Sequence, residues 1–156
     1  MGQQQLLLVI LVTIIVGIAT VVAINTFGSA ADQANIDAVN NDIASLASAA
    51  QSFYMKPTML GGGSRSFDAN GGISFNGLAF PSSEVGGENN RTAVNENGRY
   101  VIDDVTADSF TIYAYASSGM GYEPGIGGAN GEGEITAAVG PSSFELGATG
   151  EPAVEE

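Results

Sequence analysis

The sequence contains no cysteine, no histidine and no tryptophan. A chain without histidine and cysteine cannot form a histidine-dependent catalytic triad, a thiol nucleophile, a thiolate zinc site or a disulfide. Basic residues are also scarce, because four Lys and Arg stand against 17 Asp and Glu, for a net charge of −13. This charge repels phosphate backbones and argues against nucleic acid as a partner. We therefore expect a protein that is not an enzyme and has no cofactor or metal site.

The 156 residues suffice for one domain, and their composition divides into two parts. Residues 1–55 contain no Lys, Arg or Pro, and only three glycines and three acidic residues. Residues 56–156 contain all four basic residues, all five prolines and the other 19 of the 22 glycines. This division predicts a helical first part and a second part of short strands and turns.

A long apolar run extends from Leu6 to Ile24, LLLVILVTIIVGIATVVAI, and contains no charge. These 19 residues make about 28 Å of helix, close to the thickness of the hydrocarbon core of a bilayer. A secretory signal peptide would have a basic start and a shorter apolar stretch. The run predicts a transmembrane helix, or one buried equally well by protein, with the larger part of the chain exported.

The helical pattern continues beyond the apolar run with one apolar face. Its apolar residues are spaced by three and four positions and are Ile36, Val39, Ile43, Leu46, Ala50 and Phe53. No proline occurs before Pro57, and Lys56 supplies a cation at the expected helix end. We predict one helix of about 50 residues. Its many alanines permit close helix packing, and they equally reflect simple helix propensity.

Four alternating segments in the second part predict strands of an antiparallel sheet. They are Arg99–Val105, Ser109–Ala116, Ile135–Val139 and Ser143–Thr149, with a candidate miniature hairpin at Gly72–Phe80. The predicted fold is α+β, in which a long N-terminal helix packs its second half against a small sheet of about four strands. We expect an apolar helix over residues 1–30, its amphipathic continuation over 31–56 and a Gly-rich β domain over 57–156.

The remaining motifs give weak chemical signals. Gly61–Ser64 and Gly119–Gly133 lack the pattern of phosphate-binding loops and predict extended surface loops. Asn90 begins an Asn-Arg-Thr triplet and is a candidate glycosylation site. The acidic residues, including Asp103, Asp104 and Asp108, lack the spacing of a calcium loop, so we expect solvated side chains.

A polar start, an apolar helix, its amphipathic continuation and a small antiparallel sheet resemble a type IV pilin. The residues that carry the resemblance are Met1 to Phe27, MGQQQLLLVILVTIIVGIATVVAINTF, extended by the apolar face to Phe53. The resemblance implies a helix that anchors the precursor in the membrane and later forms the filament core, here through Leu6, Leu7, Leu8, Ile10, Ile14, Ile15, Ile18 and Val22. It also implies a prepilin peptidase and an assembly machinery as partners.

Three features depart from the usual pilin pattern. The family carries a glutamate near its mature N-terminus; that position is Gln5 if Met1 is the first residue, or Leu7 if cleavage follows Gly2. The helix lacks the interrupting proline of bacterial members, and the chain lacks the cysteines of a C-terminal disulfide. The last two departures resemble archaeal pilins and some unconventional bacterial ones.

The expected function is that of a structural subunit in an extracellular helical filament. Identical copies would associate through unlike surfaces, after residence of the precursor in the inner or cytoplasmic membrane. Adhesion, motility and other filament roles fit the sequence equally. Two alternatives stay open: a minor pseudopilin of a secretion machine, and a single-pass anchor that presents an acidic binding domain.

Overall fold

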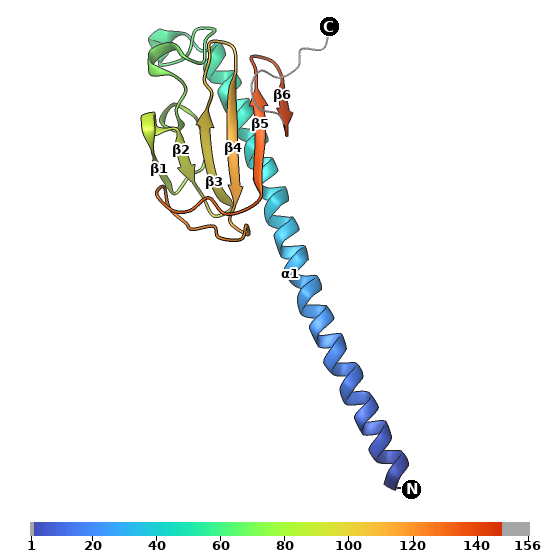
Figure 1. Ribbon diagram of the computed structural model, residues 1–156. Helices are drawn as coiled ribbons and strands as arrows, with labels where there is room; N and C mark the ends of the chain where they lie inside the picture. The colour runs from blue at the N-terminus through green and yellow to red at the C-terminus, as the bar shows by residue number, and fades with distance from the viewer. Residues whose placement is uncertain (1, 148–156) are drawn as a thin grey trace. The chain divides into compact units, whose positions relative to one another are not determined.

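The computed structural model describes residues 2–147, and its first element is a single long helix (Figure 1). Helix α1 spans Gly2–Met55, 54 residues, which confirms the prediction of one uninterrupted helix. The chain divides into two compact units, one up to Ala34 and one from Asn35 onward. The helix therefore contributes its first part to one unit and its last part to the other.

The helix ends where the chain can no longer continue its hydrogen bonding. The Lys56 N–H donates to the carbonyls of Ser52 and Phe53 at 3.1 and 3.2 Å, and Pro57 then has no N–H to offer. Gly63 donates to the Phe53 carbonyl at 2.9 Å and is buried. A Cβ at Gly63 would lie 2.0 Å from the Ser66 carbonyl oxygen, so only glycine fits. Gly61–Ser64 was thus wrongly predicted to be a plain surface loop, because it caps the helix.

Six strands form one antiparallel sheet in which neighbours in sequence are neighbours in space. The strands are β1 (Glu84–Gly86), β2 (Thr92–Val94), β3 (Gly98–Asp103), β4 (Phe110–Ala116), β5 (Glu134–Val139) and β6 (Phe144–Leu146). Strands β3, β4, β5 and β6 correspond to the four predicted segments. The last predicted segment, Ser143–Thr149, ends with Ala148 and Thr149, which lie outside the described residues. The two additional strands, β1 and β2, were not predicted.

The proposed hairpin at Gly72–Phe80 is wrong. This segment contains no strand and includes a short 3-10 helix at Phe75–Gly77. Ile73, Phe75, Leu78 and Phe80 are nevertheless buried in the core. The turn-forming Asn76 and Gly77 lie in the 3-10 helix, so the apolar residues around them reach the core without strand pairing.

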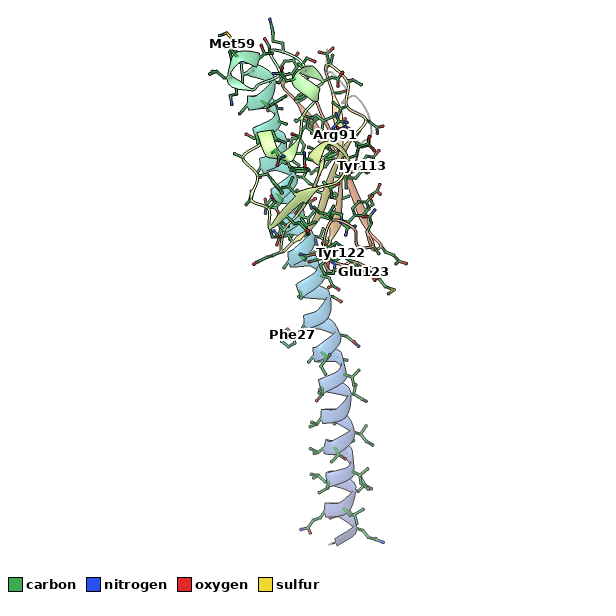
Figure 2. The ribbon with its side chains drawn as sticks, turned by 90° about the vertical axis from the view of Figure 1, so that its left-hand side faces the viewer. Phe27, Met59, Arg91, Tyr113, Tyr122 and Glu123 are labelled. Carbon is green, nitrogen blue, oxygen red and sulfur yellow. The ribbon has the colours of Figure 1, made fainter. Side chains whose placement is uncertain are left out.

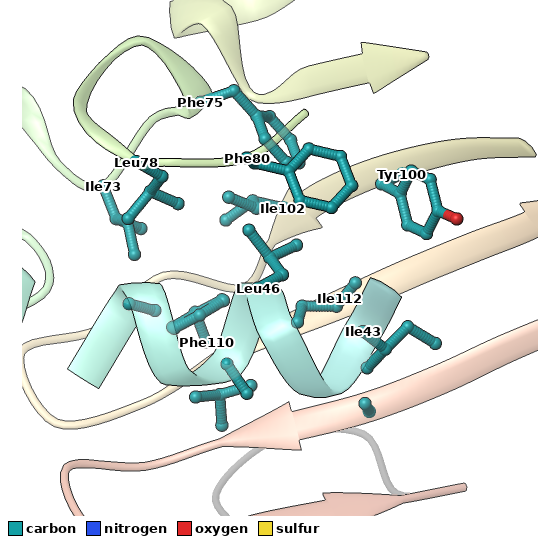
Figure 3. Packing of buried hydrophobic residues seen from close by; sticks show 14 of the residues in the cluster. Ile43, Leu46, Ile73, Phe75, Leu78, Phe80, Tyr100, Ile102, Phe110 and Ile112 are labelled. Carbon is teal, nitrogen blue, oxygen red and sulfur yellow. The ribbon is translucent and has the colours of Figure 1, made fainter. Parts of the chain in front are cut away.

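The core lies between the second part of α1 and the inner face of the sheet (Figure 3). Val39, Ile43, Leu46 and Ala50 are fully buried, Phe53 is 7% exposed, and Ile36 packs at the margin. The sheet contributes alternate residues, which are Tyr100, Ile102, Phe110, Ile112, Ala114 and Ala116. Aromatic rings extend the cluster, with Phe67 and Phe110 at 5.0 Å between centroids. The predicted helix face and the predicted α+β class are both confirmed.

Candidate functional site

The first part of α1 has an apolar surface with no partner among residues 2–147. Its large side chains between Leu6 and Ile24 are 48–69% exposed, and Phe27 is 75% exposed (Figure 2). By length and composition this helix can span a membrane. The residues predicted for a filament core all belong to this surface, which we call the apolar rod (residues 6–27).

The hydroxyl side chains of the apolar rod and of the turn after it are satisfied by the helix itself. The hydroxyls of Thr13, Thr20 and Thr26 donate to carbonyls three or four residues earlier, at 2.8–2.9 Å. Ser29 does the same at 3.1 Å. These hydroxyls therefore add no unpaired donor to the apolar surface.

Gly17 lies in the middle of the apolar rod, and no contact among the described residues requires a glycine there. A Cβ at this position would meet nothing within 4 Å, and the helix does not bend the backbone into a positive φ here. A glycine in a helix interior costs about 1 kcal/mol relative to alanine. The residue leaves a shallow gap that suits the close approach of another helix. Gln5, the predicted N-terminal contact, is exposed and has no side-chain partner among residues 2–147.

A carboxylate on the helix fixes the β2–β3 hairpin to α1. One oxygen of Asp42 accepts hydrogen bonds from Asn95 and Asn97 at 2.8 Å and from the Tyr100 hydroxyl at 2.7 Å. Burial of the Tyr100 hydroxyl, followed by its bond to Asp42, raises the pKa of this tyrosine. The group joins two segments more than 50 residues apart and sets the register between helix and sheet.

A second polar group holds the glycine-rich loop 119–133 against the sheet. Arg99 on β3 is only 2% exposed, and no carboxylate pairs with it in residues 2–147. Its guanidinium donates to four oxygens of the loop: the carbonyls of Gly128 (2.6 Å), Glu123 (2.9 Å) and Gly125, and Oδ1 of Asn130 (2.5 Å). The Tyr122 ring lies 5.7 Å from the guanidinium carbon. The loop is irregular, as predicted, but it is anchored around a buried cation.

The anchored loop also packs on the outer face of β1, the first strand of the sheet. The Ile126 N–H donates to a carboxylate oxygen of Glu84 at 3.3 Å. A Cβ added to Gly86 would lie 2.7 Å from the Ile126 side chain, so the two residues are in close contact. This role of Arg99 was not predicted, because three of its four partners are main-chain oxygens, which no side-chain pattern reveals.

The outer face of the sheet carries tyrosines paired with acidic residues. The Tyr113 hydroxyl donates to Asp104 at 2.9 Å and the Tyr115 hydroxyl donates to Glu134 at 2.6 Å (Figure 2 labels Tyr113). Burial, followed by the bond to Glu134, raises the pKa of Tyr115 to about 12. In residues 2–147 no three potential ligands among His, Cys, Asp and Glu group together as a metal site would require. These carboxylates act as hydrogen-bond acceptors for the tyrosines.

The candidate glycosylation residue lies in the turn between β1 and β2. Asn90 is exposed, with a φ of 54°, and ends a short 3-10 helix at Glu88–Asn90. The modification itself stays a prediction.

Comparisons with known proteins return no match: no family model, no curated protein and no solved structure matches this chain. The apolar rod and the folded unit that begins at Asn35 are therefore interpreted from their own chemistry.

Proposed function

We propose that this protein is the repeating subunit of an extracellular helical filament that resembles a type IV pilus. The observation that carries the proposal is the apolar rod, which is exposed on every side in the chain itself. Burying each of its large side chains would contribute about 1.5–3 kcal/mol. Lipid can cover this surface in the precursor, and copies of the same helix can cover it after assembly.

The all-round apolar character favours a multi-stranded core over a dimer. A two-helix pair covers one stripe on each helix and leaves the opposite side in water. A bundle of many parallel copies encloses each helix completely. Head-to-tail association through unlike surfaces then gives an open helix instead of a closed ring.

Gly17 distinguishes this proposal from a single-pass membrane anchor. An anchor surrounded by lipid gains nothing from a glycine, which lowers helix stability. A filament core gains closer helix contact at that point. The proposal thus gives a physical reason for a residue that the isolated chain does not explain.

The resemblance to pilins also implies an order of events. The precursor resides in the inner or cytoplasmic membrane, a prepilin peptidase processes it, and an assembly machinery moves it into the extracellular filament. These partners come from the resemblance to pilins. A minor pseudopilin would share the anchor and the folded unit, but it would not be the main component of an extracellular fibre.

The experiment is electron microscopy and mass spectrometry of material sheared from cells, with the membrane fraction analysed in parallel. We expect filaments composed mainly of this chain. Val16→Asp should abolish them, since a charge at the centre of a membrane helix costs about 2.5–3.5 kcal/mol on insertion. Asn41→Asp adds the same charge on the exposed side of the second unit and is the control, with filament yield unchanged.

A second variant separates assembly from membrane insertion. Gly17→Leu increases apolarity and helix propensity, so the chain should remain in the membrane fraction. Its larger side chain should prevent close helix contact and eliminate filaments. Confinement of the wild-type chain to the membrane fraction would instead support the anchor or the pseudopilin and refute the filament.

A further inference from the structure

The folded unit that begins at Asn35 has two chemically different ends. At one end, the N–H of Ser64 and that of Arg65 donate to the carbonyls of Lys56 and Tyr54, at 2.9 and 2.7 Å. At the other end, the Ser118 N–H donates to the Asn35 side chain at 3.1 Å. The helix between Asn35 and Met55 separates the two ends by about 30 Å. Figure 2 shows Met59 at one end and Tyr122 and Glu123 at the other.

The first end, which we call the tip (residues 55–65), combines apolar and basic side chains. Met55, Met59 and Leu60 are 74%, 96% and 66% exposed. Lys56 and Arg65 are exposed beside them, and neither side chain has a partner in residues 2–147. In a chain with only four basic residues, two lie here and are unpaired.

The second end is the base loop (residues 119–133), and it combines apolar and acidic side chains. Met120 is 76% exposed. Glu123 and Glu132 are exposed, and their carboxylates have no partner in the part of the chain that the structure describes. On the outer sheet face, by contrast, Asp104 and Glu134 each accept a bond from a tyrosine. Arg99 holds the main chain of the base loop in place, so these carboxylates are presented from an anchored surface.

We infer that the tip of one subunit binds the base loop of a second copy of this chain. Lys56 and Arg65 would face Glu123 and Glu132, while the exposed methionines of both surfaces would pack together. This contact rests on the proposed function, because parallel helices related by translation bring opposite ends of successive units together. It specifies which surfaces of the folded units complete the filament around the helical core.

The charges also select the arrangement of the copies. Contact between two tips places cations against cations, and contact between two base loops places carboxylates against carboxylates. Both like-to-like contacts are repulsive, whereas tip-to-base contact is attractive. A contact between unlike surfaces propagates as an open chain, and it does not close into a two-fold dimer.

Zero-length carbodiimide cross-linking of wild-type filaments tests the contact without any substitution. Lys56 is the only lysine in the sequence, so nearly all amine–carboxylate cross-links must start from it. We expect peptide mapping to join Lys56 to Glu123 or Glu132. Because these residues lie at opposite ends of one unit, such a product joins two subunits. Cross-links from Lys56 only to carboxylates of the outer sheet face, such as Asp103, would overturn the inference.

Charge exchange gives a second, independent measurement. Lys56→Glu with Arg65→Glu should lower filament yield about tenfold or more, and Glu123→Lys with Glu132→Lys should do the same, because like charges then meet. All four substitutions together should restore yield to within about threefold of wild type. Glu88→Lys with Asp103→Lys changes two exposed acids elsewhere and is the control, with yield unchanged.

The outcomes separate this inference from the proposed function. If the wild-type chain forms filaments and the Lys56→Glu, Arg65→Glu variant forms them with the same yield, the tip contact is wrong and the proposed function stands. Absence of wild-type filaments overturns the proposed function and the contact with it. Circular dichroism checks that each variant folds. Where a variant does not fold, the cross-linking of wild-type filaments tests the contact instead.

Discussion

Replacing Arg99 with methionine tests whether a buried cation organises the glycine-rich loop. Methionine keeps the length and the apolar stem of the side chain but removes the charge and all five donors. The substitution leaves four loop oxygens without their hydrogen bonds. We expect residues 119–133 to detach and the outer face of β1 under Ile126 to become accessible.

Two opposing terms set the size of the effect. A hydrogen bond to a charged group contributes about 1.5–3 kcal/mol, and Arg99 makes four of them. Keeping a guanidinium 2% exposed without a carboxylate partner costs several kcal/mol, and the variant no longer bears this cost. Water can also reach the freed oxygens, since Glu123 and Asn130 are exposed. The net loss in the free energy of unfolding should be about 2–4 kcal/mol.

Denaturant unfolding of the full chain in detergent measures this loss, and amide hydrogen exchange locates it. Exchange should accelerate at Glu123 and Glu132, whose N–H groups donate to Ala129 and Met120 at 2.9 and 2.8 Å. Arg91→Met is the control, because the Arg91 Nε makes one long bond of 3.4 Å to Ile73, and a loss below about 1 kcal/mol is expected. Unchanged stability and unchanged exchange in Arg99→Met would refute the account of the loop.

Three further predictions concern the two units and their ionisable groups. Removal of residues 1–30 should give a soluble, monomeric domain rich in β structure, because every buried residue of the core lies at Val39 or later; sedimentation and circular dichroism check this, and persistent aggregation would contradict it. Gln5→Leu should leave filament assembly intact, since it removes no charge; complete loss of filaments in shear assays would assign Gln5 a specific pairing role. The free energy of unfolding should fall from about pH 10 toward about pH 12, because the unfolded Tyr115 loses its proton at a lower pH than the folded one; Tyr115→Phe should weaken this fall in alkaline denaturation curves, and an unchanged pH dependence would contradict it.

The helix and the three central strands were predictable because their patterns are long. The spacing from Ile36 to Phe53 repeats over five turns of helix, and no proline interrupts it. Strands β4 and β5 alternate over six or seven residues, which is enough to show a buried face. Strands β1 and β2 have three residues each and lie in no longer alternating run, so a period of two cannot be recognised there. Strand β6 is equally short, but it lies within the longer alternating segment Ser143–Thr149.

The polar groups that fix the fold had no comparable signal. Asp42 lies among polar residues on the helix, so the sequence alone predicts a solvated acid. In the structure, three donors from the hairpin and the sheet bind its carboxylate. Arg99 stands on the outer face of β3 and reads as an exposed cation. Its burial depends on a loop that returns 24–31 residues later and offers three main-chain oxygens, which any sequence possesses, and one side-chain oxygen, Oδ1 of Asn130. Local patterns report local geometry, and these contacts are not local.

The self-satisfied hydroxyls of α1 have a consequence for how the helix changes surroundings. Thr13, Thr20 and Thr26 hold their hydrogen bonds within their own turn of helix, whatever lies outside. Transfer of the apolar rod from lipid into a protein environment would therefore break no hydrogen bond at these side chains and require no new one. The hydroxyls of this helix thus place no hydrogen-bonding demand on its surroundings, which can be lipid or other helices.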